Sequence, residues 1–394
     1  MNLAKRTLKL SLSLILVLIL GLGLSACGGP GATLTPPAPT TSPVPTTAIA
    51  TAQPTATLAP TVGLTAPPLG TTTAPLSVGL TPTVLALTRP GQPSSGPGGT
   101  SNYLHQTALQ SVYDTGENQY YIFEPANPAP KSAPLIILMH GYGDIAPDRF
   151  RLWIEHLVKR GNLVIYPIYQ QAIFSSGENF TNSAAKAIRN ALEQLKNGKV
   201  TPELDKVSYF GYSAGGIITA NLVAQTESLG LPAPKSLFLM TPGGSLGYGL
   251  VSGNGQKLEI PGFKLETADR LAKIPPGTKM VVVVADRDTT VGDIAAKFIW
   301  QSSSQVADTN RAFVRFNTDT HGKPPLIADH GIANRAQPDA LNFFGMWKLF
   351  DALQSCALSG KDCEVALGDT AAQRFMGKWS DGQPVKELTI EKNP

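Results

Sequence analysis

Apolar and polar residues follow one another along residues 118–353 in blocks that indicate short buried strands separated by amphipathic helices. Residues 134–139 are a continuous apolar run, which is typical of a strand buried on both faces. Residues 279–285 contain four successive valines, which favour a strand. Residues 147–160 and 181–197 instead repeat their apolar side chains at helical spacing. Further strands are predicted at residues 118–123, 163–166, 207–210, 236–240 and 312–316, and further helices at 265–272, 292–302 and 339–353. This alternation predicts an α/β fold with a mostly parallel central sheet and helices on both faces.

One stretch, residues 207–222, reads VSYFGYSAGGIITANL and predicts a strand, a sharp turn and a helix. Ser213 stands at the tip of this turn, where a strained backbone would push its hydroxyl out above the sheet. Glycines flank it at positions where a Cβ would collide with the neighbouring strand and helix. The amide of Ala214 would face a developing oxyanion at the positive end of the helix. Ser213 is therefore the candidate nucleophile.

A second Gly-x-Ser-x-Gly pattern surrounds Ser245 and serves as an internal comparison. It also follows a predicted strand, but residues 248–255 after it are too rich in glycine to form a helix. We interpret Ser245 as an ordinary loop serine.

Candidate partners of a nucleophile follow other predicted strands. Asp286 and Asp288 come directly after the valine strand, and His321 and His330 follow the last strand. Acyl transfer by a serine needs a base that takes its proton, a carboxylate that orients the base, and donors for the oxyanion. Ligand sites of parallel sheets lie at the carboxyl ends of the strands, where all of these residues fall.

The strand, turn and helix around Ser213 are here called the elbow. The elbow, the His140-Gly141 turn and the order serine, acid, histidine along the chain resemble the α/β-hydrolase superfamily over residues 118–353. Within it the chain looks most similar to dienelactone-hydrolase-like or lipase-like esterases. The resemblance implies an α/β-hydrolase fold. Residues 243–263 are too few for a large lid, so we expect no large cap domain.

The resemblance also suggests roles for the polar residues. The family often ends the strand before its catalytic acid in a Gly-x-x-Asp-x-x-Val turn, here called the acid turn. Asp288, with Val291 three residues after it, fits this pattern better than Asp286, which remains the alternative acid. The family places its histidine close to the last strand, which favours His321 as the base. His330, which follows Asp329, is the alternative base.

The remaining roles concern the oxyanion hole. The amide of Tyr142, after His140-Gly141, is implied as its second donor beside that of Ala214. His140 itself would shape the turn rather than take part in the chemistry.

This set of residues predicts a serine hydrolase that cleaves carboxylic esters, with small-molecule or lipid esters as substrates and neither cofactor nor metal required. Two alternatives stay open. One is a non-catalytic binding lipoprotein on a hydrolase scaffold, because fold does not fix function. The other is a serine peptidase of the same fold. No pattern in the sequence indicates a particular oligomeric state.

The first 27 residues predict a targeting segment, with three basic residues before an apolar stretch at residues 10–24. It ends in Leu24-Ser25-Ala26-Cys27, which resembles the lipobox of bacterial lipoproteins. The resemblance implies cleavage before Cys27 and acylation of its sulfur. The protein would then lie outside the cytoplasm, in the cell envelope, anchored to a membrane by lipid. An ordinary signal peptide and a short membrane anchor are the alternatives.

Residues 28–100 are rich in Thr, Pro, Ala and Gly, and we expect a disordered, extended linker before a catalytic domain at 101–394. The first hundred residues hold no Asp or Glu and four of the 32 basic residues, which leaves 28 basic and 28 acidic residues in the domain. A neutral domain argues against a nucleic-acid partner. Cys356 and Cys363 predict a disulfide, and no further ligand nearby supports a metal site.

Overall fold

The computed structural model describes residues 87–171, 175–245, 250–251, 257–258 and 260–394. The predicted targeting segment, with Cys27, and the linker up to residue 86 lie outside these described residues. Among the residues that are described, no helix is both long and apolar enough to cross a membrane.

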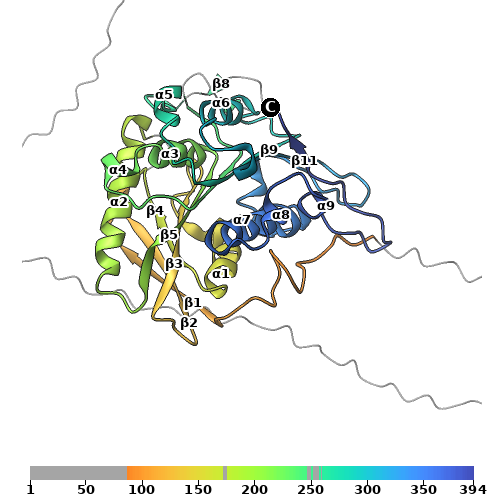
Figure 1. The fold of residues 1–394 in the computed structure, drawn as a ribbon, viewed down its shortest axis with the longest axis horizontal. Coiled ribbons are helices and arrows are strands. Elements are labelled where there is room, and N and C mark those ends of the chain that lie inside the picture. The colour runs from red at the N-terminus through yellow and green to blue at the C-terminus, as the bar shows by residue number, and fades with distance from the viewer. Residues whose placement is uncertain (1–86, 172–174, 246–249, 252–256, 259) are drawn as a thin grey trace, which may run out of the picture. The chain divides into compact units, whose positions relative to one another are not determined.

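In the described part of the chain, nine strands form one sheet in the order β1-β2-β4-β3-β5-β6-β9-β10-β11 (Figure 1). The strands are β1 Thr107–Tyr113, β2 Tyr120–Ala126, β3 Ser132–Met139, β4 Leu163–Pro167, β5 Thr201–Tyr212, β6 Ser236–Met240, β9 Lys279–Ala285, β10 Arg311–Phe316 and β11 Thr389–Glu391. From β4 to β10 all neighbours pair in parallel, whereas the pairs of β2 with β1 and β4, and of β11 with β10, are antiparallel. This order and these directions are those of the α/β-hydrolase fold, and the predicted fold class is confirmed.

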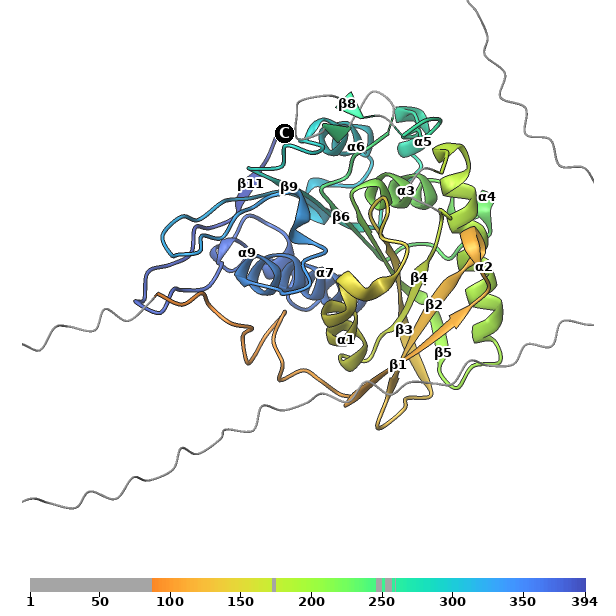
Figure 2. The same cartoon turned by 180° about the vertical axis from the view of Figure 1, so that it is seen from behind.

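Helices cover both faces of the sheet (Figure 2). On one face lie α2 Phe180–Leu195, α3 Ala214–Val223 and α6 Ile294–Ser302; on the other lie α1 Arg151–Lys159 and α7 Lys348–Ser359. The position of strand β3 explains why residues 133–139 are all apolar. Leu135 and Ile137 pack on the first set of helices, and Ile136 and Leu138 pack on the second. Both faces of a parallel strand are buried, so no polar position interrupts it.

The shorter elements join the larger ones or end the chain. They are η1 Gly116–Asn118, η2 Pro147–Phe150, η3 Gly177–Asn179, α4 Thr226–Leu229, β7 Leu250–Val251, β8 Lys257–Leu258, α5 Ala268–Leu271, η4 Asp308–Asn310, η5 His330–Ile332, the π-helix η6 Leu341–Trp347, α8 Cys363–Ala366 and α9 Ala371–Arg374. Between β6 and β9 the described residues form only β7, β8 and α5, without a helical cap.

The chain between residues 87 and 105, here called the strap, packs on the folded domain. The backbone N–H of Gly98 donates to the Asp351 carboxylate at 2.7 Å, and Asp351 also bonds His156 Nε2 at 2.9 Å. The Tyr103 hydroxyl lies 3.0 Å from His156 Nδ1. Residues 87–100, the last part of the expected linker, thus contribute to a buried polar cluster on α1 and α7.

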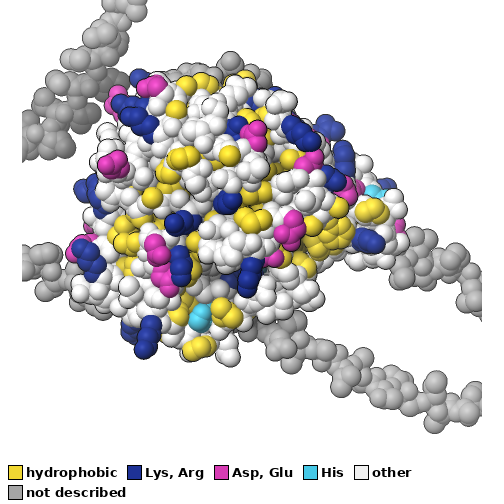
Figure 3. Space-filling model, in the orientation of Figure 1, with side chains coloured by type: hydrophobic (Ala, Val, Ile, Leu, Met, Phe, Trp, Pro, Cys, Tyr) yellow, Lys and Arg dark blue, Asp and Glu magenta, His cyan; other side chains and the backbone are white. Residues whose placement is uncertain are grey.

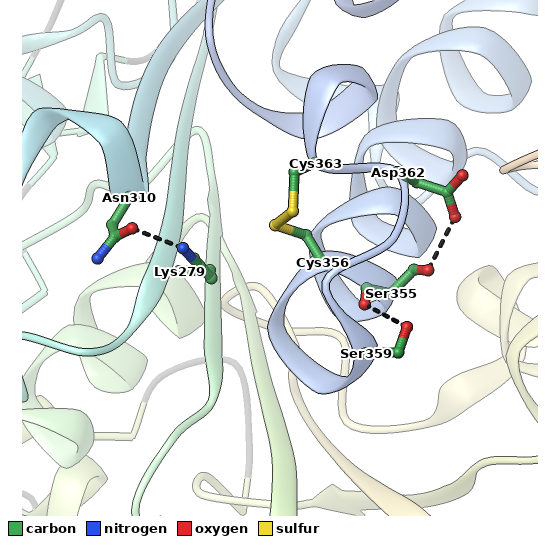
Figure 4. Close-up of a disulfide and its surroundings, with 7 residues drawn as sticks. All are labelled: Lys279, Asn310, Ser355, Cys356, Ser359, Asp362 and Cys363. Carbon is green, nitrogen blue, oxygen red and sulfur yellow. Dashed lines mark hydrogen bonds between the residues drawn. A yellow bond between two sulfur atoms is a disulfide. The ribbon is translucent and has the colours of Figure 1, made fainter.

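The predicted disulfide between Cys356 and Cys363 is confirmed and joins α7 to α8 (Figure 4). Beside it, the Ser355 hydroxyl donates to the Asp362 carboxylate at 2.8 Å. The disulfide and this hydrogen bond close the same short turn after α7.

Charged side chains of both signs are interspersed on the face of the molecule shown in Figure 3. Hydrophobic side chains lie between them on the same face. No single-sign field covers this face, in keeping with the balanced charge of the domain.

The packing of the strap on the domain leads to a prediction about stability. Gly96 and Gly98 both have positive φ values, 75° and 79°, but a Cβ on Gly98 would lie 2.5 Å from the Phe343 carbonyl oxygen, whereas one on Gly96 meets nothing within 4 Å. An alanine in this backbone region costs about 1–2 kcal/mol by itself. Gly98→Ala should lower the free energy of unfolding by about a further 1–3 kcal/mol, since the clash is with backbone.

Denaturant unfolding of both variants measures this difference, with Gly96→Ala as the matched control. Equal destabilisation by the two substitutions would contradict docking of the strap.

Candidate active site

The turn between β5 and α3 holds Ser213 in a conformation that non-glycine residues rarely adopt. Its φ is 55° and its ψ is −123°. Its N–H donates to the Met240 carbonyl at 3.0 Å, and its own carbonyl accepts from Gly216 at 2.9 Å. Neighbouring elements thus fix the strained backbone, as such positions require. The residue is 4% exposed.

The flanking glycines are sterically required, as the sequence suggested. A Cβ on Gly211 would lie 2.3 Å from the Thr219 hydroxyl of α3. A Cβ on Gly215 would lie 2.2 Å from the His140 carbonyl oxygen, just past the end of β3. Only glycine lets the elbow approach its own helix and the adjacent strand this closely.

Ser245, in the second pattern, has a different environment. It is fully buried, and its hydroxyl has no hydrogen-bond partner among the described residues. The next described element after it is the two-residue strand β7 rather than a helix. Residues 246–249 lie outside the described part of the chain.

The turn after β9 places its two aspartates differently. The Asp288 carboxylate lies 2.8 Å from His330 Nδ1 through Oδ2, and its Oδ1 accepts from the N–H groups of Thr290 and Val291 at 2.9 and 3.0 Å. The Asp286 carboxylate instead accepts from the N–H and the hydroxyl of Thr318, at 2.9 and 2.7 Å. Asp288, the preferred acid, is the one that reaches an imidazole. Asp286 ties this turn to the chain after β10.

The imidazole at Ser213 belongs to His330. Its Nε2 lies 2.9 Å from Ser213 Oγ. A carboxylate only accepts hydrogen bonds, so Nδ1 carries the proton that His330 shares with Asp288. Nε2 is then the acceptor for the Ser213 hydroxyl. This is the tautomer that a general base needs.

His321, the preferred base in the sequence analysis, lies elsewhere. Its Nε2 bonds the Asp381 carboxylate at 2.8 Å, and its ring packs edge-on against Trp379. The preference for His321 over His330 is corrected by this geometry. After β10 the chain first folds back on itself, since Asp319 and Leu326 exchange two backbone hydrogen bonds of 2.8 Å. His321 sits inside this fold-back, and the chain returns to the sheet only nine residues later.

Two backbone N–H groups near the elbow are free to bind a substrate oxygen. Among the described residues, neither Ala214 N–H nor Tyr142 N–H has an acceptor. Ala214 is the first residue of α3, where the helix dipole favours negative charge. The next amide after Tyr142, that of Gly143, is held by the Gln170 side chain at 2.9 Å, which fixes this turn.

His140 supports the same turn from below. Its Nδ1–H donates to the Gly141 carbonyl at 2.7 Å, and its ring stacks between Tyr166 and Tyr169. Burial lowers the pKa of His140 to about 4, so the ring is neutral near pH 7. The side chain shapes the turn, as the sequence analysis expected.

Two residues near His330 carried no signal in the sequence. Asp144 accepts from the Asn334 amide at 3.0 Å, which joins the turn after β3 to the chain after His330. Burial raises the pKa of Asp144, while the hydrogen bond from Asn334 and the charge of Arg149 act in the opposite direction. Asp144 lies three residues after Gly141 of the His-Gly turn.

No family model and no curated protein matches the sequence of this chain. Among solved structures it is similar to an esterase from Rhizomucor miehei, at 16% identity and a TM-score of 0.46, over 66% of this chain and 85% of that one. It is also similar to carboxyl esterase 2 from Tuber melanosporum, at 18% identity and a TM-score of 0.43, over 58% and 78% of the two chains. The fold and the site described above rest on this chain's own strand order and contacts.

The two histidines make a direct test of the site. His330→Ala should slow covalent labelling of Ser213 by a fluorophosphonate probe by about a thousandfold or more, because the hydroxyl loses its base. His321→Ala should leave the labelling rate within about threefold, since the described contacts of the ring are with Asp381 and Trp379 and not with Ser213.

Labelling rates of the purified variants, with unfolding curves to confirm that both are folded, provide the measurement. A larger loss in His321→Ala than in His330→Ala would overturn the assignment.

Proposed function

We propose that this protein is a serine hydrolase that cleaves carboxylic esters through an acyl-enzyme intermediate. The observation that supports it is one line of hydrogen bonds, from Asp288 through His330 to Ser213. The three side chains come from segments far apart in sequence and meet at the carboxyl ends of β5, β9 and β10. That edge is where parallel sheets hold their ligands.

The first half of the reaction forms the acyl-enzyme. His330 Nε2 takes the proton of the Ser213 hydroxyl while Oγ attacks the ester carbonyl carbon. The carbonyl oxygen becomes an oxyanion, and the N–H groups of Ala214 and Tyr142 donate to it. The Asp288 carboxylate stabilises the imidazolium that forms. His330 then gives its proton to the leaving alcohol as the carbon–oxygen bond breaks.

The second half repeats these steps with water. His330 removes a proton from a water molecule, whose oxygen attacks the acyl carbon, and the same N–H groups hold the second oxyanion. The proton returns to Ser213 Oγ, and the carboxylic acid leaves. Every group used belongs to this chain, so the scheme calls on no cofactor.

The Asp288 contacts explain how its carboxylate keeps its orientation. Oδ1 is occupied by two backbone N–H groups, so only Oδ2 is directed at His330. A carboxylate fixed in this way holds the imidazole in one tautomer and one plane.

We further propose that the enzyme works outside the cytoplasm, anchored by lipid on Cys27, with residues 28–86 as a spacer. The Cys356–Cys363 disulfide supports an oxidising compartment. A membrane-anchored hydrolase would meet lipid esters as well as small soluble esters.

Ester turnover tests the proposal. Ser213→Ala should lower kcat for a short-chain p-nitrophenyl ester by about 10⁴-fold or more, because no nucleophile remains. Ser245→Ala is the matched control and should keep kcat within about threefold, since its hydroxyl has no partner in the described structure.

Steady-state kinetics of the three proteins decide the matter. If Ser213→Ala stayed within tenfold of the wild type, the nucleophile would be wrong. A wild type without turnover or probe labelling would leave a binding protein on a hydrolase scaffold.

A further inference from the structure

Arg89, which lies in the strap before the expected catalytic domain, reaches the loop that carries His330. Its Nε and Nη2 donate to the Pro324 carbonyl at 3.2 Å, and Nη2 also donates to the Pro325 carbonyl at 2.6 Å. Its Nη1 lies 3.6 Å from the Asp339 carboxylate. One guanidinium thus contacts two successive carbonyls and a carboxylate.

The contacted loop runs from the end of β10, at Phe316, to His330. Without contacts it would have considerable conformational freedom, at about 1–2 kcal/mol of backbone entropy for each residue that must be ordered. Near its start, two hydrogen bonds from Thr318 to the Asp286 carboxylate hold the loop against the acid turn. Arg89 holds the middle of the loop through the carbonyls of Pro324 and Pro325, where the fold-back around His321 ends.

A second arginine continues the network to His330 itself. Asp339 also bonds Arg335 at 2.7 Å, and Arg335 Nη2 donates to the Asp329 carboxylate at 3.0 Å and to the Ile327 carbonyl. Asp329 precedes His330 directly. The contacts therefore run without a gap from the strap to the residue next to the base.

The strap can act as a fixed point because it is anchored on both sides of Arg89. Thr88 and Ser380 exchange two hydrogen bonds, of 3.0 and 3.2 Å. Further along, Gly98 N–H is held by the buried Asp351 carboxylate. Arg89 thus lies between a contact with the turn at Ser380 and a contact with the buried Asp351 of α7.

We propose that Arg89 is a positioning residue that holds the loop of His330 in its working place, so that the end of the membrane tether is part of the active-site support. This rests on the proposed function. Arginine suits the role because its planar guanidinium directs several N–H donors at fixed angles, whereas a lysine ammonium is a single point. Displacing a catalytic group by about 1 Å can cost about a hundredfold in rate.

The test uses the full-length chain in detergent micelles. The variants are Arg89→Met, which keeps much of the side-chain length without donors, and Arg89→Lys, which keeps the charge. Arg151→Met is the matched control, because Arg151 is exposed on α1 and its one ion pair among the described residues is with Glu155. Active sites are counted by fluorophosphonate titration, so that kcat refers to folded enzyme. Hydrogen–deuterium exchange follows residues 317–335.

Arg89→Met should lower kcat by about 10- to 100-fold with KM within about threefold, because a misplaced base affects the reaction and not substrate binding. Arg89→Lys should lie between it and the wild type. Exchange should rise in residues 317–335 and stay unchanged in β3 and β5. Arg151→Met should match the wild type in all three readouts.

An unchanged kcat in Arg89→Met, or an equal loss in Arg151→Met, would overturn the proposal. So would exchange that rises across the whole domain, which would mean general destabilisation. If the wild type showed no turnover, the proposed function would fail, and exchange in residues 317–335 would still decide whether Arg89 holds the loop.

Discussion

The hydrogen bond between His330 and Ser213 is the contact on which the rest of the site depends. It joins residues 117 positions apart, and it exists only if the elbow and the loop after β10 end at the same edge of the sheet. The parallel order of β5, β6, β9 and β10 supplies that edge. Strain at Ser213 and the close approach of Gly215 to β3 are consequences, because the hydroxyl must stand above the sheet to meet the imidazole.

Most polar groups around this contact are already satisfied by the protein. Asp288 is held by two N–H groups, and the Gly143 amide by Gln170. The backbone N–H groups of Ala214 and Tyr142 have no acceptor among the described residues. Fixed, unpaired donors beside a nucleophile stabilise charge that appears during a reaction without having to reorganise first. This is the arrangement that the proposed acyl transfer needs, because its substrate oxygen becomes negative.

The central strands, the elbow and the acid turn could be predicted from the sequence, because each depends on local pattern. Residues 236–240 and 279–285 form strands with the predicted limits. The edge strands β1 and β11 were missed, since half-exposed edges lack a clear apolar pattern. The positions of the two histidines could not be predicted, because the fold-back of Asp319 on Leu326 and the pairing of His321 with Asp381 are tertiary contacts that local pattern does not indicate. The contacts of the strap could not be predicted, because its composition resembles that of a linker, whereas its backbone and a few side chains such as Arg89 and Tyr103 contact the domain.

Trapping the intermediate tests the central claim most directly. The wild type is mixed with a short-chain ester, quenched in acid during turnover, digested and analysed by mass spectrometry. The account predicts an acyl group on the peptide that contains Ser213 and no acyl group there in His330→Ala. Ester consumption by the wild type with the acyl group on another residue, or with none on Ser213 in a rapid-quench time course, would contradict it.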